Sequence, residues 1–125
     1  MSPAIQRGEI WNVNFDPQVG AEIGKVRPAV VMNVSTAGRL PLHIIVPITT
    51  GRASFNQYFW MVPIPASPTN GLGHDSFADA FQVKSVSVNR FVSKLGVVTR
   101  PQIDEIAAAV VLCIGYSPPQ PKPTP

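Results

Sequence analysis

The sequence predicts a mainly β domain, a small and strongly curved sheet or barrel with one C-terminal helix packed on it. Short segments with apolar or alternating patterns follow one another along most of the chain, and each has the length of a strand. One longer amphipathic segment near the C-terminus has the length and spacing of a helix. With 125 residues, of which 45% are hydrophobic, the chain is long enough for one domain with its own core.

The predicted strands differ in how their apolar residues are spaced. Residues 10–15 alternate, which places the apolar side chains on one face of a half-buried strand. Residues 29–34 and 42–48 are nearly continuous apolar runs, typical of strands that are covered on both faces. Further strands are predicted over residues 58–64, 77–83, 85–88 and 95–98.

The helix is predicted from its capping residues and from one apolar face. Thr99 and Gln102 have the T-x-x-Q spacing of a capping box, so we expect the helix to begin at Thr99. Gly115 can end it, because glycine adopts the backbone conformation that terminates helices. The predicted apolar face consists of Ile103, Ile106, Ala107, Val110, Val111 and Ile114.

Charge and cysteine content restrict the class of protein. The formal net charge of +3 permits an anionic partner, but no block of like charges marks a protein that coats DNA. Only 14% of the residues are charged, which indicates apolar surface that a partner or a second copy covers. Cys113 is the single cysteine, so neither an intrachain disulfide nor a cysteine cluster for zinc can form. No apolar run is long enough for a membrane span. We expect a soluble, cytoplasmic protein without a metal or another cofactor.

The C-terminal segment differs in composition from the rest of the chain. The segment SPPQPKPTP, residues 117–125, is rich in proline and cannot form regular ladder or helix hydrogen bonds. We expect residues 1–116 to form a single domain and residues 117–125 to be a disordered tail. A proline-rich ligand for another protein is the alternative role of this tail.

The most informative stretch is GKVRPAVVM, residues 24–32, in which two cations and a proline precede a run of apolar residues. Arg27 is either a solvated charge at the start of a strand or a charge that the strand holds in front of an anion. The residues alone leave both interpretations open.

Four stretches together resemble the MazF/PemK toxins, also called the Kid family, of bacterial toxin–antitoxin pairs. They are RGEIWNVNFDPQVGAEIGKVRPAVVM at residues 7–32, IIVPITT at 44–50, HDSFADAFQVKSV at 74–86 with Asn89 and Arg90 after it, and LGVVTRPQIDEIAAAV at 95–110. The first is the most specific, because R-G-[DE]-[IV]-W, D-P-x-x-G-x-E and R-P-x-V-V follow one another with fixed gaps. The resemblance covers nearly the whole chain except the proline-rich tail.

The resemblance implies a small SH3-like barrel with a C-terminal helix, which is usually a homodimer that a cognate antitoxin wraps and blocks. It implies a metal-independent endoribonuclease that cuts single-stranded RNA, such as mRNA, at short sequences and leaves a 2′,3′-cyclic phosphate and a 5′-hydroxyl. Two other functions stay open. One is a non-catalytic toxin of the same barrel superfamily that binds a topoisomerase, and the other is a plain RNA- or protein-binding barrel.

Attack by the RNA's own 2′-OH needs a proton acceptor, positive charge near the phosphorane oxygens and a proton donor to the leaving oxygen. Arg27 matches the arginine of the family's R-P motif, and its planar guanidinium can bind two phosphate oxygens. Thr49 matches the hydroxyl residue of the P-I-T motif and can donate to a phosphate oxygen or lie against the 2′-OH. The resemblance thus implies that Arg27 and Thr49 are catalytic, whereas an ordinary strand-end threonine is the alternative for Thr49. It does not identify the general base.

Other positions are candidates for binding RNA rather than for chemistry. The resemblance places Gly20, Ala21, Glu22 and Ile23 in a loop that touches bases, and it assigns RNA contacts to Ser76 and Gln82. Glu22 either accepts from a base or braces the loop. Candidate contacts to the RNA backbone, each of which can also be a solvated charge, are Lys25, Arg52, Lys84 and Arg90. Arg90 also lies at a family-like position, where a structural role is a further alternative.

The segment before Gln82 departs from one branch of the family. PemK/Kid proteins carry an arginine and an aspartate, two positions apart, just before this glutamine. The matching positions here are Asp79 and Phe81, so that acid–base pair is missing. The resemblance therefore implies the mechanism of the MazF branch, centred on Arg27 and Thr49.

Overall fold

The computed structural model describes residues 4–117, which form a seven-stranded antiparallel sheet and one α-helix. The strands are β1 (Glu9–Asn14), β2 (Val26–Val31), β3 (Leu42–Thr50), β4 (Met61–Ile64), β5 (Ser76–Asp79), β6 (Lys84–Ser87) and β7 (Phe91–Val97). Short 3-10 helices are η1 (Ala53–Gln57), η2 (Ala80–Gln82) and η3 (Val88–Arg90), and the helix is α1 (Arg100–Cys113). Residues 118–125 of the predicted tail lie outside the described residues.

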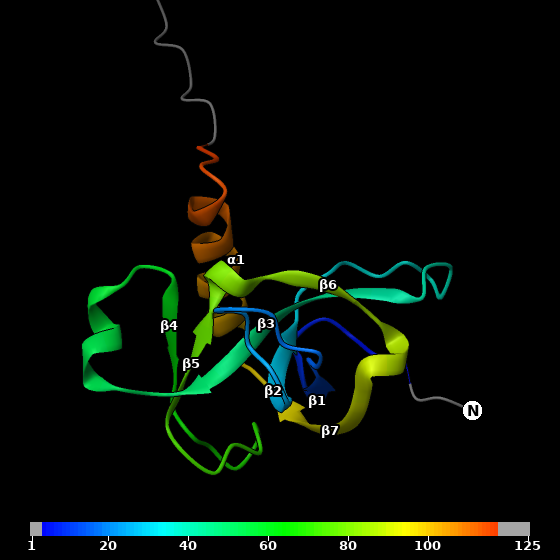
Figure 1. Ribbon diagram of the computed structural model, residues 1–125, viewed down its shortest axis with the longest axis horizontal. Helices are drawn as coiled ribbons and strands as arrows, with labels where there is room; N and C mark the ends of the chain where they lie inside the picture. Colours follow the sequence, from blue (N-terminus) through cyan, green and yellow to red (C-terminus); the bar gives the residue numbers. More distant parts are fainter. Residues whose placement is uncertain (1–3, 118–125) are drawn as a thin grey trace, which may run out of the picture.

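The sheet has the strand order β4-β5-β3-β2-β1-β7, and β6 also pairs with β3 (Figure 1). The long strand β3 makes this possible, because its first half pairs with β6 and its last residues pair with β5. The predicted mainly β fold with one C-terminal helix is confirmed. Within residues 4–117, β4 and β7 at the two ends of this path do not pair, so hydrogen bonds do not close the sheet into a complete barrel.

Two apolar clusters fill the two faces of the sheet. Alternate residues of β1 and β2, such as Ile10 and Val30, join the larger cluster, which includes buried residues of α1. Their neighbours Trp11 and Val31 point to the opposite face and join the second cluster. Residues 10–15 were predicted as a strand buried on one face only. This prediction is wrong for the first half of β1, because both faces of the sheet are covered there.

The helix α1 begins as predicted, since Thr99 and Gln102 form the complete capping box. In its N-terminal half the predicted apolar face points to the core, and Ile103 and Ile106 are buried. Its C-terminal half differs, because Ala109 is buried instead of Val111, and Ile114 is exposed at the C-cap. Among the described residues, no helix is long and apolar enough to cross a membrane.

The predicted strand over residues 77–83 is interrupted. β5 ends at Asp79, whose carboxylate accepts a hydrogen bond from the backbone N–H of Phe81 and caps η2. The apolar pattern alone cannot reveal this break, because a side chain that satisfies the backbone locally competes with the strand ladder. The result is a bend that turns the chain from β5 toward β6.

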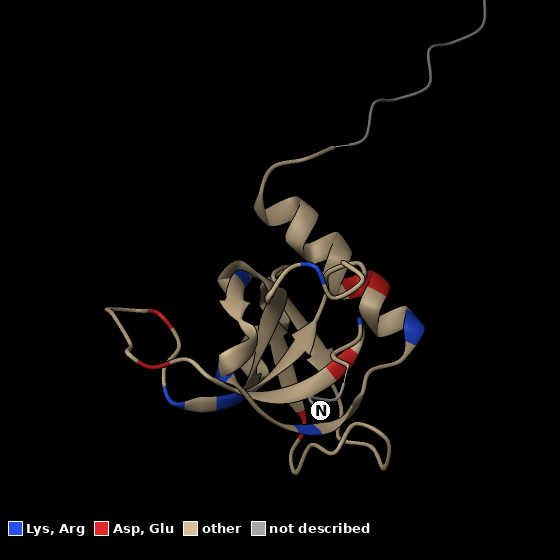
Figure 2. Ribbon diagram, turned by 90° about the vertical axis from the view of Figure 1, so that its right-hand side faces the viewer, with Lys and Arg blue, Asp and Glu red and all other residues tan. Residues whose placement is uncertain are grey.

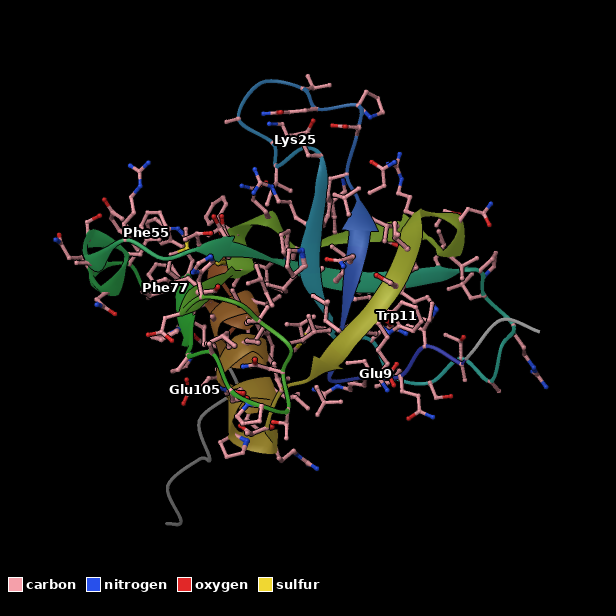
Figure 3. The ribbon with its side chains drawn as sticks, turned by 90° about the horizontal axis from the view of Figure 1, so that it is seen from below. Glu9, Trp11, Lys25, Phe55, Phe77 and Glu105 are labelled. Carbon is pink, nitrogen blue, oxygen red and sulfur yellow. The ribbon has the colours of Figure 1, made fainter. Side chains whose placement is uncertain are left out.

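Glu9 connects β1 to β7 and to the N-terminal segment from a nearly buried position (Figure 3). One carboxylate oxygen accepts from the backbone N–H of Gln6 at 2.9 Å and from Nε1 of Trp11 at 3.0 Å. The other oxygen lies 2.7 Å from Nζ of Lys94 on β7. Burial alone raises the pKa of Glu9, but the hydrogen bonds from Lys94, Gln6 and Trp11 outweigh it and lower the pKa overall.

The substitution Glu9→Gln should lower the free energy of unfolding by about 1–2 kcal/mol at neutral pH, because it removes the charge that Lys94 contacts. The native pKa of Glu9 lies below its ordinary value of 4.5. The contribution of the carboxylate is therefore present above that value and is lost as the pH falls through the native pKa. Urea unfolding from neutral to acidic pH should show the difference between wild type and variant shrinking below about pH 4.5.

Glu105→Gln is the matched control, because Glu105 lies exposed on α1 (Figure 3). An equal loss of stability in the two variants, or a Glu9→Gln difference that does not change with pH, would contradict this account of Glu9.

Candidate functional site

The loop between β1 and β2, residues 15–25, projects from the body of the molecule and carries both acidic and basic residues (Figure 2). Its two ends are joined, because the backbone N–H of Phe15 donates to the carbonyl of Lys25 at 2.8 Å. The backbone N–H of Lys25 in turn donates to Oδ1 of Asp16 at 2.8 Å. Lys25 has a φ of 64°, a left-handed conformation in which the chain turns into β2.

Arg90, the last residue of η3, contacts the base of this loop. Its Nη1 donates to the backbone carbonyls of Asn14 at 3.0 Å and of Asp16 at 2.6 Å. Arg90 was a candidate contact to the RNA backbone, with a solvated charge and a structural role as alternatives. The structure favours the structural role, because the guanidinium binds the backbone where β1 becomes the loop.

Arg27 lies two residues after the loop, exposed on β2 and paired in register with Val13. Its side chain has no hydrogen-bond or ion-pair partner among residues 4–117. The guanidinium is therefore available to an anion from solution. An arginine in this state keeps a permanent charge and all its donors for a ligand.

Thr49 lies near the end of β3, half-buried and paired with Phe77 of β5. The pairs between β2 and β3 run from Val31↔Ile45 to Ala29↔Pro47. Continuing this register by two residues places Arg27 opposite Thr49, on the face of the sheet to which Ala29 also belongs. The two residues that were predicted as catalytic thus lie on adjacent strands, each two residues beyond the last β2–β3 pair, Ala29↔Pro47.

Two prolines explain why the ladder stops short of this pair. Pro28 and Pro47 have no backbone N–H, so neither can donate to a neighbouring strand. The described β2–β3 pairs end at Ala29↔Pro47, one residue before Pro28 would be reached. Beyond this point Arg27 stays paired with Val13 of β1, and Thr49 pairs with Phe77 of β5.

Aromatic rings border Thr49. Phe77 packs edge to face on Phe55 of η1 with 5.6 Å between the ring centroids, and the two rings lie together at one end of the molecule (Figure 3). Gly51 permits this packing, because a Cβ atom there would lie 2.6 Å from Cε2 of Phe77. Thr49 is therefore flanked by aromatic side chains on the β5 side.

A cavity of about 690 Å³ lies between the β1–β2 loop and the segment that contains η2 and the start of β6. Its lining residues come from the loop, from the residue before β4 and from the β5–β6 segment: Ala21, Glu22, Ile23, Trp60, Asp79, Phe81, Gln82, Val83 and Lys84. Gln82 crosses one side of it, since its Oε1 accepts from the backbone N–H of Ile23 at 2.7 Å. Its Nε2 donates to Oδ2 of Asp79 at 3.3 Å.

Some of the predicted RNA-binding residues line the first cavity, and others lie elsewhere. Those that line it are Ala21, Glu22, Ile23, Gln82 and Lys84. Gly20 lies at the exposed tip of the loop with a φ of 56°, and it does not line the cavity. Ser76 is buried, and its hydroxyl donates to the carbonyl of His74 at 2.9 Å. Lys25 is exposed at the loop base.

The sequence did not single out Asp79, Trp60 and Phe81 as parts of a site. Asp79 was noted only as a departure from a related pattern, although it is nearly buried at the cavity. Burial raises the pKa of Asp79, while hydrogen bonds from Gln82 and the backbone of Phe81 oppose this rise. A lone aspartate in an apolar stretch, followed three positions later by an amide side chain, was the signal that could have identified it.

Two further findings limit where other chemistry could lie. A second cavity of about 600 Å³ lies between the N-terminal segment and the β2–β3 loop, and it contains none of the predicted site residues. His43 lies there half-buried, with Nδ1 at 3.3 Å from Oδ1 of Asn33, and burial lowers its pKa. Within residues 4–117, no three His, Cys, Asp or Glu side chains are grouped so that they could hold a metal ion.

Comparisons with known proteins identify the class first. A family model described as "PemK-like, MazF-like toxin of type II toxin-antitoxin system" matches residues 6–114. A mainly β domain with a C-terminal helix and a projecting β1–β2 loop is thus the fold of a class of small toxins. The chain belongs to the PemK-like, MazF-like toxin family.

Individual relatives agree with this assignment. The chain is 35% identical over 114 residues to "Endoribonuclease MazF9" of Mycobacterium tuberculosis, a match that covers 86% of this chain and 94% of the relative. Its fold is similar to the crystal structure of MazF from Deinococcus radiodurans, with a TM-score of 0.77 and 24% identity over 92% of this chain and all of that chain. It also resembles a mycobacterial endoribonuclease solved with its cognate antitoxin, with a TM-score of 0.72 and 16% identity, covering 93% and 100% of the two chains.

The role of Arg90 at the loop base can be tested by proteolysis. Arg90→Ala removes two hydrogen bonds from a charged donor to the backbone of the loop, so the loop should open more often. Cleavage by trypsin after Lys25, followed by mass spectrometry, should become faster by about tenfold.

Arg39→Ala is the control, because Arg39 is exposed in the β2–β3 loop at the other end of β2. If Arg90→Ala and Arg39→Ala are cleaved after Lys25 at the same rate, Arg90 does not hold the loop.

Proposed function

We propose that this chain is the toxin of a type II toxin–antitoxin system and a metal-independent endoribonuclease that cuts single-stranded RNA at specific short sequences. The observation that carries the proposal is the exposed guanidinium of Arg27, which has no hydrogen-bond or ion-pair partner among residues 4–117 and lies on the strand next to the one that carries Thr49. The endoribonuclease name of the mycobacterial relative, 35% identical to this chain, supports the same activity.

In this mechanism the RNA supplies its own nucleophile, the 2′-OH next to the scissile phosphate. Arg27 binds the phosphate through its planar fork and stabilises the negative charge that develops on the phosphorane oxygens. The Thr49 hydroxyl donates to a phosphate oxygen or lies against the attacking 2′-OH. The products are a 2′,3′-cyclic phosphate and a 5′-hydroxyl end, so no water enters the first step.

Recognition of the RNA is assigned to the loop and to the cavity beside it. Gly20, Glu22 and Ile23 present backbone and side-chain groups to bases that are not paired, and Gln82 adds an amide at the cavity. Lys25 contacts the RNA backbone from the base of the loop. Ser76 was also expected to contact RNA, and the hydrogen bond from its hydroxyl to His74 supports a contribution through the shape of the turn before β5.

The protein partners follow from the same family. A different protein, the mycobacterial endoribonuclease of similar fold that is 16% identical to this chain, was solved with its cognate antitoxin, which supports a protein antitoxin for this chain as well. A homodimer agrees with the exposed apolar residues, among them Phe81, Leu112 and Ile114, and with the low charge content. We also propose that residues 1–116 act as one domain, to which residues 117–125 add a tail.

The purified protein should cleave a long single-stranded RNA of mixed sequence in excess EDTA, and Arg27→Ala should reduce the rate by about a hundredfold or more. Because Arg27 is exposed, the variant should unfold at the same temperature as wild type. Mapping of the cleaved ends gives the activity, the recognised sequence and the end chemistry together.

Arg39→Ala supplies the control for loss of a surface positive charge, and it should cleave RNA like wild type. Intact RNA after prolonged incubation with wild type would reject the nuclease and favour a toxin that binds a topoisomerase or a plain binding domain. Cleavage that stops in EDTA would reject the metal-independent mechanism but not the substrate.

Thr49→Val replaces the hydroxyl by a methyl group of similar size, so it tests the hydroxyl without removing the packing against Phe77. The expected result is a fall in kcat of about tenfold to a hundredfold with little change in stability. Cleavage rates of a short RNA under saturating conditions measure it.

Thr50→Val is the matched control on the next residue of β3, which points to the opposite face. Equal rates for the two variants would show that the hydroxyl of Thr49 has no special role.

A further inference from the structure

The tip of the β1–β2 loop is connected to the rest of the molecule by few contacts. The loop base is held by Asp16, Lys25 and Arg90, as described above. Among residues 4–117, the one hydrogen bond from the tip, residues 17–24, to a residue outside the loop is that of Ile23 to Gln82. The Ile23 side chain also packs against the second apolar cluster. The position of the tip therefore depends on one apolar contact and one hydrogen bond.

Gln82 can form that hydrogen bond in one orientation of its amide only. The oxygen must face Ile23, since a backbone N–H donates there, and the NH₂ group must point away. The NH₂ group finds Oδ2 of Asp79, and an ionised carboxylate only accepts hydrogen bonds. Asp79 therefore fixes which end of the Gln82 amide faces the loop.

Capping of η2 does not by itself require a carboxylate at position 79. Ser87 caps η3 in the same way, with a hydroxyl that accepts from the backbone N–H of Asn89 at 3.2 Å. Asp79 uses Oδ1 for its cap and has a second oxygen, which accepts from Gln82. A carboxylate that is only 8% exposed is costly to bury, so the second oxygen needs an explanation beyond the cap.

We propose that Asp79 is a positioning residue for RNA recognition: through Gln82 it holds the tip of the β1–β2 loop in the conformation that reads the RNA sequence. We term the chain of hydrogen bonds from Asp79 through Gln82 to Ile23 the loop latch. The latch also fixes one side of the cavity that Phe81 and Trp60 line. The proposal rests on the proposed endoribonuclease function, and it assigns Asp79 no contact with RNA and no part in proton transfer.

The first test needs no RNA and uses amide hydrogen exchange of Ile23 measured by NMR. Asp79→Asn keeps the size and the capping oxygen but presents an NH₂ group to Gln82, so the Gln82 amide must turn over and the bond to Ile23 is lost. Exchange at Ile23 should become about tenfold faster or more. Because burial already disfavours the charge of Asp79, the neutral variant should fold.

A double variant separates the latch from a purely structural role. In Asp79→Asn combined with Gln82→Glu, the new amide at position 79 donates to the new carboxylate at position 82. The second oxygen of that carboxylate accepts from Ile23, and the net charge of the chain is unchanged. Exchange at Ile23 should return to within about twofold of wild type. Asp104→Asn, an exposed position on α1, is the control and should not change it.

The second test measures cleavage of short RNAs of varied sequence. Asp79→Asn should raise KM about threefold to tenfold, change kcat less than about twofold and increase cutting at sequences that wild type leaves intact. A fall in kcat with KM unchanged would overturn the proposal, because Asp79 would then act in the chemical step. Failure of the double variant to restore protection at Ile23 would overturn it as well.

The two tests distinguish this proposal from the function on which it rests. A wild-type chain that cuts no RNA would reject the endoribonuclease and the recognition role of Asp79 with it. An unchanged exchange rate at Ile23 in Asp79→Asn, in a protein that does cut RNA, would reject the latch alone.

Discussion

The register of β2 against β3 is the constraint on which the rest of this structure depends. Side chains of a strand alternate between the two faces of the sheet, so a shift of one residue would move every side chain of one strand to the other face. In the observed register Val30 and Val46 enter the cluster beneath α1, while Val31 and Ile45 enter the cluster on the opposite face. Burial of each such side chain contributes about 1.5–3 kcal/mol, so the register is strongly determined. The placement of Arg27 and Thr49 on adjacent strands, each two residues beyond the last of these pairs, follows from it.

The fixed register of β2 explains how the backbone position of an exposed arginine can be well defined. The side chain of Arg27 makes no hydrogen bond or ion pair with residues 4–117, yet its backbone is paired with Val13 of β1, and the strand that carries it also pairs with β3 from Ala29 onward. Removal of the guanidinium therefore changes the side chain that β2 exposes and leaves the backbone pairing and the buried residues of β2 unchanged. The prolines at positions 28 and 47 add a second effect, because they end the ladder just where the polar side chains begin.

The apolar patterns predicted most strands and the helix, because burial against one or two faces produces these patterns directly. The capping box at Thr99 was predictable for a similar reason, since all its contacts are local. The end of β5 at Asp79 and the exposure of Ile114 were not predictable from the patterns. The first results from the Asp79 cap of η2, which the apolar pattern does not reveal, and the second lies at the C-cap of α1.

The candidate site was predictable in part, through a resemblance and not through a physical pattern. Arg27 and Thr49 were proposed because they match the R-P and P-I-T motifs of the MazF/PemK family, whereas the residues alone left the role of Arg27 open. The hydrogen bond from Ile23 to Gln82 joins residues 59 positions apart, and no local pattern marks it. Arg90 is a similar case, since its contacts with Asn14 and Asp16 span more than 70 residues. Side chains that hold a loop through long-range hydrogen bonds are visible only once the fold is known.

The site therefore combines two parts whose stabilities have different origins. The part with Arg27 and Thr49 is set by the register of strands with buried faces, and it can change only if the cores change. The part that is proposed to read the RNA sequence lies on a loop whose tip depends on a few side chains, among them Ile23 and Gln82. Substitutions in the loop and its supports can therefore alter recognition while the chemistry stays intact. This separation gives a physical reason why the proposed recognition of RNA can change while the fold stays the same.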